Sequence, residues 1–441
     1  MLTRRELLCS AGVLIQSAQP RPPNVLFILA DQWRAQTLPS AGDPDLRAPN
    51  LARLAELGIT FSRAYTTNPV CSPARASIMT GRFPHSCKMP RNNLLLPLEE
   101  RCLAEQYRRA GYATGYIGKW HLDGAEIPGF VPPGPRRRGF DYWAAFNRGH
   151  FYYDSTYFRD TPEPIRESGF EPDYQTRLAI DFIRTHKEKP FLLFLSWGPP
   201  HSPRRPPDRV KGLYEAGQFH LRPNVPASYA SQARKGYLGY YGLCSALDEN
   251  LGRLLRELEQ NRLLADTIVV FTADHGDMLG SHGLENKGVP YEESARIPCL
   301  VSYPRRLKGG RTDDTLISNL DYMPTLLGMC GLDAPQGIQG QDLSELILNG
   351  AGRRPESVYV QGRLGTPGEW RMIVRGFDKL VVDAKFEPTH LFNLAEDPYE
   401  MTNQIDDRTQ RRRIDELTAV LKSWSRRTGD RVPYPDTRRR P

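Results

Sequence analysis

One cysteine of this sequence has neighbours that suit chemistry better than packing. Cys71 opens the stretch Cys71-Ser72-Pro73-Ala74-Arg75, and the proline lies close to the first position of an expected helix. The N-terminus of a helix presents free N–H groups and the positive end of the helix dipole, so it favours an anion. Arg75, one turn further along, adds a guanidinium to the same end. These residues predict an anion-binding or reactive site at Cys71.

Polar and ionisable residues also follow the ends of four expected strands. They are Asp31 with Gln32, Lys119 with His121, His201, and Asp274 with His275. In an open α/β sheet, ligands bind outside the carboxyl ends of the strands. One such residue alone is commonly a helix cap or a surface group. Polar residues from four segments that meet at the carboxyl edge of one sheet, its rim, instead indicate a functional site.

The residue types at this rim define the chemistry that they can support. Asp31, Gln32 and Asp274 offer hard oxygen donors, which suit calcium or magnesium better than zinc. Lys119 and, further along the chain, Lys287 add cationic donors. The set predicts a site for a tetrahedral oxyanion that is built on one divalent metal.

The elements that carry these residues alternate between strands and helices. A continuous apolar run of strand length occupies residues 24–30, further strands are expected at 113–117, 190–196 and 267–272, and helical segments are expected near 100–109, 174–186 and 236–261. Such runs are typical of strands that are buried on both faces of a parallel sheet. We therefore expect an α/β fold with a large, mostly parallel sheet flanked by helices.

The pattern changes after about residue 345. Short strands at 357–360, 371–374 and 379–382 are joined by connections too short for crossover helices, and a last helix carries Ile414, Leu417 and Leu421 on one face. This predicts a smaller C-terminal α+β subdomain with an antiparallel sheet. The expected organisation is a catalytic domain over residues 23–345, the subdomain over 346–428 and a basic tail over 429–441.

Composition and the two ends of the chain limit the class of protein. Of 441 residues, 39% are apolar and 25% charged, which is typical of a globular protein, and no apolar run approaches the ~20 residues of a membrane-spanning helix. Several arginines that contribute to the net charge of +8 lie near the C-terminus, so we expect no nucleic-acid partner. Residues 1–22 combine Arg4-Arg5, a short apolar stretch and a Pro-rich spacer. They predict an export signal, and hence a periplasmic or extracellular protein, over the alternative of a frayed tail.

The motifs together resemble the sulfatase family, the formylglycine-dependent sulfuric ester hydrolases of the alkaline phosphatase superfamily. Cys71 to Arg75, followed by Thr80-Gly81-Arg82, is similar to the sulfatase motif. Further similar blocks stand in the same order along most of the chain: Asn24 to Gln32, Gly118 to His121, Pro200-His201, Thr272 to Asp277, Lys287 to Pro298, Leu320 to Thr325, and Leu391 to Asn403. The combination is far more specific than any one block.

The resemblance implies an activity and a role for each residue. A maturation enzyme would convert Cys71 to formylglycine, and the substrate would be a sulfated small molecule or carbohydrate. Asp31, Gln32, Asp274 and His275 would hold a divalent metal, calcium first, with Mg²⁺ or Mn²⁺ as alternatives. Lys119 and Lys287 would bind sulfate oxygens, and Arg75 would stabilise the formylglycine hydrate. His201 would protonate the departing alkoxide, and His121 would accept a proton from the second hydroxyl.

Two departures from the common family pattern leave alternatives open. Many members have a second aspartate where this chain has Gln32, and asparagine where it has His275. Both variants also occur in related phosphonate and phosphate monoester hydrolases, so that activity is an alternative; an unmodified, non-catalytic anion-binding protein is a third possibility. The aromatic and arginine-rich segment 128–173 either walls the substrate pocket or is a surface excursion.

Overall fold

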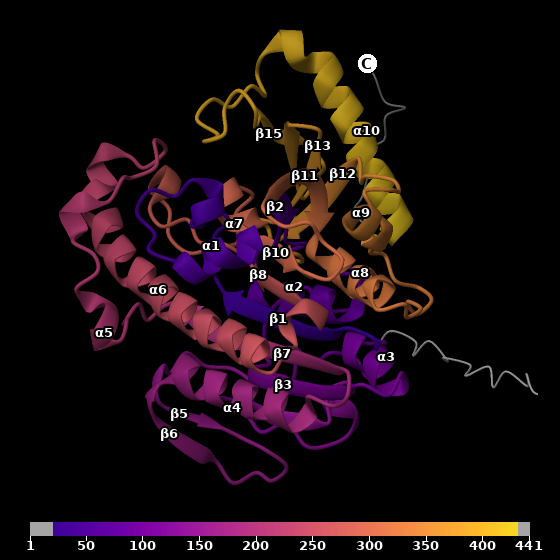
Figure 1. Cartoon of the computed structure of the whole chain (residues 1–441). Coiled ribbons are helices and arrows are strands. Elements are labelled where there is room, and N and C mark those ends of the chain that lie inside the picture. The colour runs from indigo at the N-terminus through magenta and orange to yellow at the C-terminus, as the bar shows by residue number, and fades with distance from the viewer. Residues whose placement is uncertain (1–20, 431–441) are drawn as a thin grey trace, which may run out of the picture.

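The computed structural model describes residues 21–430 of the chain (Figure 1). Within them, nine strands form the central sheet in the order β11-β2-β10-β8-β1-β7-β3-β4, with β9 paired to β2. The strands are β1 (Asn24–Asp31), β2 (Gly58–Tyr65), β3 (Ala113–Lys119), β4 (Tyr142–Phe146), β7 (Phe191–Pro200), β8 (Thr267–Ala273), β9 (Arg296–Ile297), β10 (Cys299–Ser302) and β11 (Arg311–Ser318). The pairs β1–β7, β1–β8, β3–β7, β3–β4 and β2–β11 are parallel, whereas β9 and β10 run antiparallel to their neighbours.

The centre of this sheet is made by the apolar runs seen in the sequence. Every residue of β1 and β8 is buried, because both faces of these strands are covered. Alternation along the strands separates the two faces. On one face, Phe27 stacks on Phe194 and meets Tyr322 of α8 (Tyr322–Met329) edge-on. On the other, Gly115 leaves room for the ring of Phe182 in α4 (Glu171–His186).

Helices cover both faces, as the prediction required. The long helix α6 (Ala230–Gln260) packs against α4 and α1 (Pro49–Glu56), while α2 (Cys71–Thr80), α3 (Leu103–Arg109) and α8 contact one another. The remaining helices are α5 (Asp208–Lys211), α7 (Glu292–Ala295), α9 (Ser344–Asn349) and α10 (Arg411–Thr428). No helix among the described residues combines the length and apolar character needed to cross a membrane.

The C-terminal part forms a separate antiparallel sheet, which lies with α10 at the top of Figure 1. Its strands follow one another in chain order: β12 (Ser357–Gly362), β13 (Trp370–Arg375), β14 (Asp378–Asp383) and β15 (Pro388–Asn393). Ile414, Leu417 and Leu421 of α10 are buried against this sheet, as their helical spacing predicts. The predicted fold class is thus confirmed for both sheets.

Several details were not expected from the sequence. β15 adds a fourth strand to the C-terminal sheet. The segment 128–173 is not one loop, because β4 joins the edge of the central sheet and β5 (Tyr153–Tyr157) pairs with β6 (Ile165–Phe170) as a hairpin. The predicted export signal lies outside the described residues except for its last two positions, and so does the basic tail beyond residue 430. The predicted domain limits stay predictions.

Candidate active site

Four neighbouring strands, β8, β1, β7 and β3, carry polar residues at their carboxyl ends. Asp31 and Lys119 are the last residues of β1 and β3, Asp274 follows β8, and His201 follows β7. The backbone ties these ends together, since the N–H of His201 donates to the carbonyl of Asp31 at 3.1 Å and the N–H of Asp274 donates to Ala30 at 3.3 Å. Parallel neighbours end at the same rim, so the sheet itself gathers these side chains.

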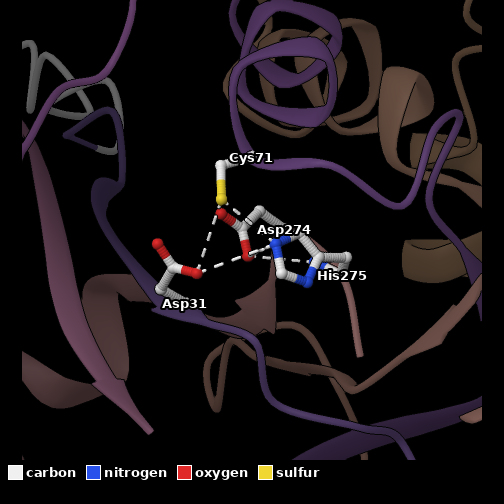
Figure 2. A group of neighbouring side chains, drawn as sticks. All are labelled: Asp31, Cys71, Asp274 and His275. Atoms are coloured by element: carbon white, nitrogen blue, oxygen red, sulfur yellow. Dashed lines mark hydrogen bonds and ion pairs between the residues drawn. The ribbon is translucent and has the colours of Figure 1, made fainter. Parts of the chain in front are cut away.

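A buried group of four side chains lies at the centre of this rim (Figure 2). One ligand atom from each of Asp31, Cys71, Asp274 and His275 lies within 4.8 Å of the others. The Sγ of Cys71 is 3.2 Å from Nε2 of His275 and 3.8 Å from Oδ1 of Asp31. His275 donates from Nδ1 to the carbonyl of Gly276 at 3.0 Å. In neutral His275 this leaves the lone pair of Nε2 directed into the group.

Two buried cations form ion pairs with the carboxylates of this group. Arg75 donates from Nε to Asp274 at 3.0 Å and from Nη2 to Asp31 at 3.3 Å. Its Nη1 donates to the hydroxyl of Ser196 at 2.7 Å and to the carbonyl of Lys119 at 2.8 Å, so the guanidinium is held on every side. The ammonium of Lys119 donates to Oδ2 of Asp31, the same oxygen that accepts from Arg75. Buried charges are tolerated when they are paired in this way.

These contacts fix the charge of the site. Burial disfavours the charged carboxylate of Asp31, but Lys119, His201 and Arg75 outweigh it and hold its pKa well below the ordinary value. Burial also opposes the thiolate of Cys71, as does Asp31, yet Lys119, Lys287 and His275 lower its pKa. The cations around the site thus favour the anionic forms of both side chains.

Gln32 adopts a backbone conformation that is uncommon for a residue with a side chain. Its φ is +70°, a strained region that persists where surrounding contacts enforce it. Its amide donates to Asp277 at 2.6 Å, and its amide oxygen accepts from Lys287. Asp277 in turn pairs with Arg204 at 2.7 Å. Gln32 thus holds Lys287 close enough for its charge to lower the pKa of Cys71.

The two predicted proton-transfer histidines follow neighbouring strands, His121 after β3 and His201 after β7. His121 has φ +59°, and its carbonyl accepts from the hydroxyl of Ser72 at 2.7 Å, which ties it to the start of α2. Its Nε2 is 3.3 Å from the amide oxygen of Asn93, and its buried Nδ1 has no hydrogen-bond partner among residues 21–430. His201 uses Nδ1 to donate to the carbonyl of Ser202 at 2.7 Å. Burial lowers the pKa of His201 to about 4, and Lys287 and Lys119 add to the effect while Asp31 opposes it.

The structure adds His150, which the sequence analysis did not single out. Its ring stacks on His201, its Nε2 is 3.4 Å from the ammonium of Lys119, and its Nδ1 is 3.1 Å from the hydroxyl of Tyr152. Asp277 appeared in the sequence analysis only as the last residue of the block Thr272 to Asp277, and it was given no role. The feature of the sequence that could have pointed to His150 is its position inside the long aromatic segment 128–173. At least part of that segment lines the site.

The comparisons with known proteins agree with this geometry. The sulfatase family profile matches residues 23–332. The chain belongs to the sulfatase family. It is 35% identical over 430 residues to an ulvan-active sulfatase from Formosa agariphila, across 94% of this chain and 83% of that protein. An N-acetylglucosamine-6-O-sulfatase from Bacteroides thetaiotaomicron is 26% identical over 520 residues, across 95% of this chain and 89% of that protein.

A solved structure described as a sulfatase, YidJ from Bacteroides fragilis, superposes on this sulfatase with a TM-score of 0.88. The two share 32% identity, over 95% of this chain and 98% of the other. The family resemblance and the sulfuric ester hydrolase activity predicted from the motifs are therefore confirmed. The roles of the individual residues stay predictions.

Proposed function

We propose that this sulfatase hydrolyses sulfate esters of carbohydrates after Cys71 has been converted to formylglycine. The observation that carries the proposal is the placement of the Cys71 side chain at the start of α2, in a buried group with Asp31, Asp274 and His275. A structural cysteine needs no such partners, since burial among apolar residues is enough for it. The residue proposed to receive the modification thus lies within 4.8 Å of three of the expected metal ligands.

The donor atoms fit a divalent metal. Asp31 and Asp274 offer hard oxygens, and Nε2 of His275 offers its lone pair in the neutral ring, all within 4.8 Å of one another. Gln32 is expected to complete the set, although its amide oxygen here accepts from Lys287. Calcium fits the oxygen-rich set best, and the nitrogen of His275 keeps Mg²⁺ and Mn²⁺ as alternatives. A metal held there would lower the pKa of the attacking hydroxyl and take up charge on the sulfate group.

The other residues of the site would bind the sulfate group and transfer protons. Lys119 and Lys287 carry the positive charge that binds the sulfate oxygens, and Arg75 holds the start of α2 against the two aspartates. One hydroxyl of the hydrated formylglycine attacks sulfur, and the alcohol departs with a proton from His201. The second hydroxyl gives a proton to His121, the bond between carbon and the sulfate oxygen breaks, and sulfate leaves as the aldehyde forms again. Water then restores the hydrate.

The substrate class follows from the relatives and from the cations of the site. One relative is named for ulvan and another for a sulfated amino sugar, so a sulfated carbohydrate is the proposed substrate of this chain. The proposed partner is a formylglycine-generating maturation enzyme. Export to the periplasm or beyond is proposed from residues 1–22 alone.

Two measurements test the proposal. A mass spectrum of the tryptic peptide that contains residue 71, prepared from a host with the maturation enzyme, is expected to show formylglycine. With protein of known formylglycine content, kcat/KM is expected to be higher on an aryl sulfate than on the matched phosphate and phosphonate esters. A preference for phosphate or phosphonate would support the alternative activity, and full activity with unmodified Cys71 would overturn the mechanism.

A further inference from the structure

A groove of about 510 Å³ lies beside the site, between the β5–β6 hairpin and the segment that follows His201. Tyr153 and Phe170 line one side, and residues 204–209 line the other. Two neighbouring tyrosines connect the groove to the active site. The hydroxyl of Tyr152 lies 2.8 Å from the carbonyl of His201, and that of Tyr153 donates to the carbonyl of Arg205 at 3.1 Å. The hairpin therefore holds both ends of the segment from 201 to 205.

The charges along this groove are mostly neutralised. Arg204 pairs with Asp277, and Arg209 pairs with Asp173 at 2.8 Å and with Glu249 at 2.6 Å. Lys211 pairs with Asp208 in the same helix. Arg205 differs, because its exposed side chain has no ion pair and no hydrogen bond within residues 21–430. The groove thus holds one guanidinium that is available to an anion from outside the protein.

Besides its paired charges, the groove has an aromatic and proline surface beside Arg205. The ring of Tyr153 is 37% exposed and is tilted against Phe170, with 5.8 Å between their centroids. Pro206 and Pro207 line the groove directly after Arg205, and proline fixes its own backbone φ, so less conformational freedom is lost when a ligand binds. Aromatic surface next to an unpaired charged group suits a ligand that presents both an apolar face and an anion. Here it matches the face of a sugar that carries an anionic substituent.

We propose that this groove is a subsite for a second, negatively charged sugar of the substrate, with Arg205 binding its sulfate or carboxylate group. The inference rests on the proposed function, because it assumes that another sulfate of the same molecule occupies the site at Cys71. Arg205 lies four residues after His201, a backbone span of at most about 14 Å. The groove therefore selects an oligosaccharide over a small sulfate ester with one charge.

The test is a binding measurement on the metal-loaded, full-length Cys71→Ser protein, which cannot complete turnover. Calorimetry gives the affinity for a ulvan tetrasaccharide, for the same tetrasaccharide after chemical desulfation, and for inorganic sulfate. Arg205→Ala is expected to weaken tetrasaccharide binding about ten-fold, the size of one exposed charge-assisted contact, and to change sulfate binding less than two-fold. Arg205→Lys is expected to recover part of the loss. Arg412→Ala, on a side chain of α10 that is 92% exposed, is the matched control.

Each outcome decides the question. If Arg205→Ala also weakens binding of the desulfated tetrasaccharide, Arg205 recognises a carboxylate. If it weakens binding of the sulfated form alone, Arg205 recognises a sulfate. Equal affinities of parent and Arg205→Ala for all probes would overturn the subsite, and so would a parent that binds sulfate but no tetrasaccharide. Failure of the proposed function shows itself separately, as formylglycine-containing enzyme that turns over no sulfate ester.

Discussion

The imidazole of His150 lies parallel to that of His201, with 3.7 Å between the ring centroids and 2° between the ring planes. The hydroxyl of Tyr152 is 3.1 Å from Nδ1 of His150 and 2.8 Å from the carbonyl of His201. The hydroxyl of Tyr152 donates its one proton to a carbonyl oxygen. Nδ1 of His150 therefore donates to the hydroxyl oxygen of Tyr152, and Nε2 of neutral His150 accepts from Lys119. His150 thus contacts both Lys119, the predicted sulfate-binding cation, and His201, the predicted acid.

His150→Ala removes the ring that supports His201 and one acceptor for the ammonium of Lys119. We expect kcat/KM for a sulfate ester to fall about 10- to 100-fold, because small misplacements of reacting groups are costly. His150→Asn, which keeps an acceptor near Lys119, is expected to recover KM more than kcat. Steady-state kinetics on both variants check this, with His220→Ala on an exposed histidine as the control. Equal effects of His150→Ala and His150→Asn on KM and kcat would contradict the role at Lys119.

Cys71→Ser is expected to abolish multiple turnover. A serine hydroxyl can attack sulfur, but a sulfated serine lacks the second hydroxyl that expels sulfate. Mass spectrometry of the variant after incubation with an aryl sulfate is expected to show the introduced serine either unmodified or in a stable sulfated form. Continuous turnover by this variant would contradict the two-hydroxyl mechanism.

His201→Ala is expected to affect substrates according to their leaving groups. A phenolate with a low pKa departs without a proton, whereas an alkoxide needs one, so kcat/KM is expected to fall least on activated aryl sulfates and most on alkyl or sugar sulfates. A general acid contributes about 10²- to 10⁴-fold, which sets the scale for the sugar sulfates. A loss of equal size across a series of leaving groups would show that His201 has another role.

Removal of divalent metal is expected to abolish activity. Asp31 and Asp274 would then lose the metal cation that offsets part of their negative charge, while their ion pairs with Arg75 and Lys119 keep the pocket folded. Activity measured after chelation, with metal content determined in parallel, is expected to return with Ca²⁺. Asp274→Asn is expected to reduce the bound metal per chain as well as the rate. Full activity in protein shown to be metal-free would contradict the assignment.

Glu171 gives a prediction of stability that does not involve catalysis. Its side chain is 1% exposed, and burial raises its pKa to about 8, although Gln175 and Lys119 act in the opposite direction. Between pH 4.5 and pH 8 the folded chain therefore keeps a proton on Glu171 that the unfolded chain has lost. The contribution of Glu171 to the free energy of unfolding therefore falls as the pH rises through this range.

Glu171→Gln replaces the carboxyl with a neutral side chain of similar shape and removes this titration. From pH 5 to pH 8 we expect the free energy of unfolding of the parent protein to fall by about 2 to 4 kcal/mol more than that of the variant. Urea denaturation at both pH values measures the difference, and all other titrating groups contribute equally to both proteins. The same pH slope in parent and variant would show that Glu171 is charged in the folded state.

The sequence by itself determined the fold class and the residues of the rim. The apolar runs of β1 and β8 require burial on both faces, so a parallel sheet follows, and a parallel sheet brings the residues after its strands to one edge. The motif from Cys71 to Arg75, together with the other similar blocks in the same order along the chain, identified the family. Local pattern and local chemistry were sufficient for both conclusions.

Only the tertiary structure decided which side chains meet. His150 is far along the chain from His201, and no spacing rule connects residues on different strands and loops, so its stacking could not be predicted. The pairing of Lys287 with Gln32 likewise depends on how the loop after β8 folds back over β1. Arg205 has an ordinary sequence context, and it became distinct only when the other cations of its groove were found to be paired. Long-range contacts of this kind depend on packing, which the sequence pattern does not specify.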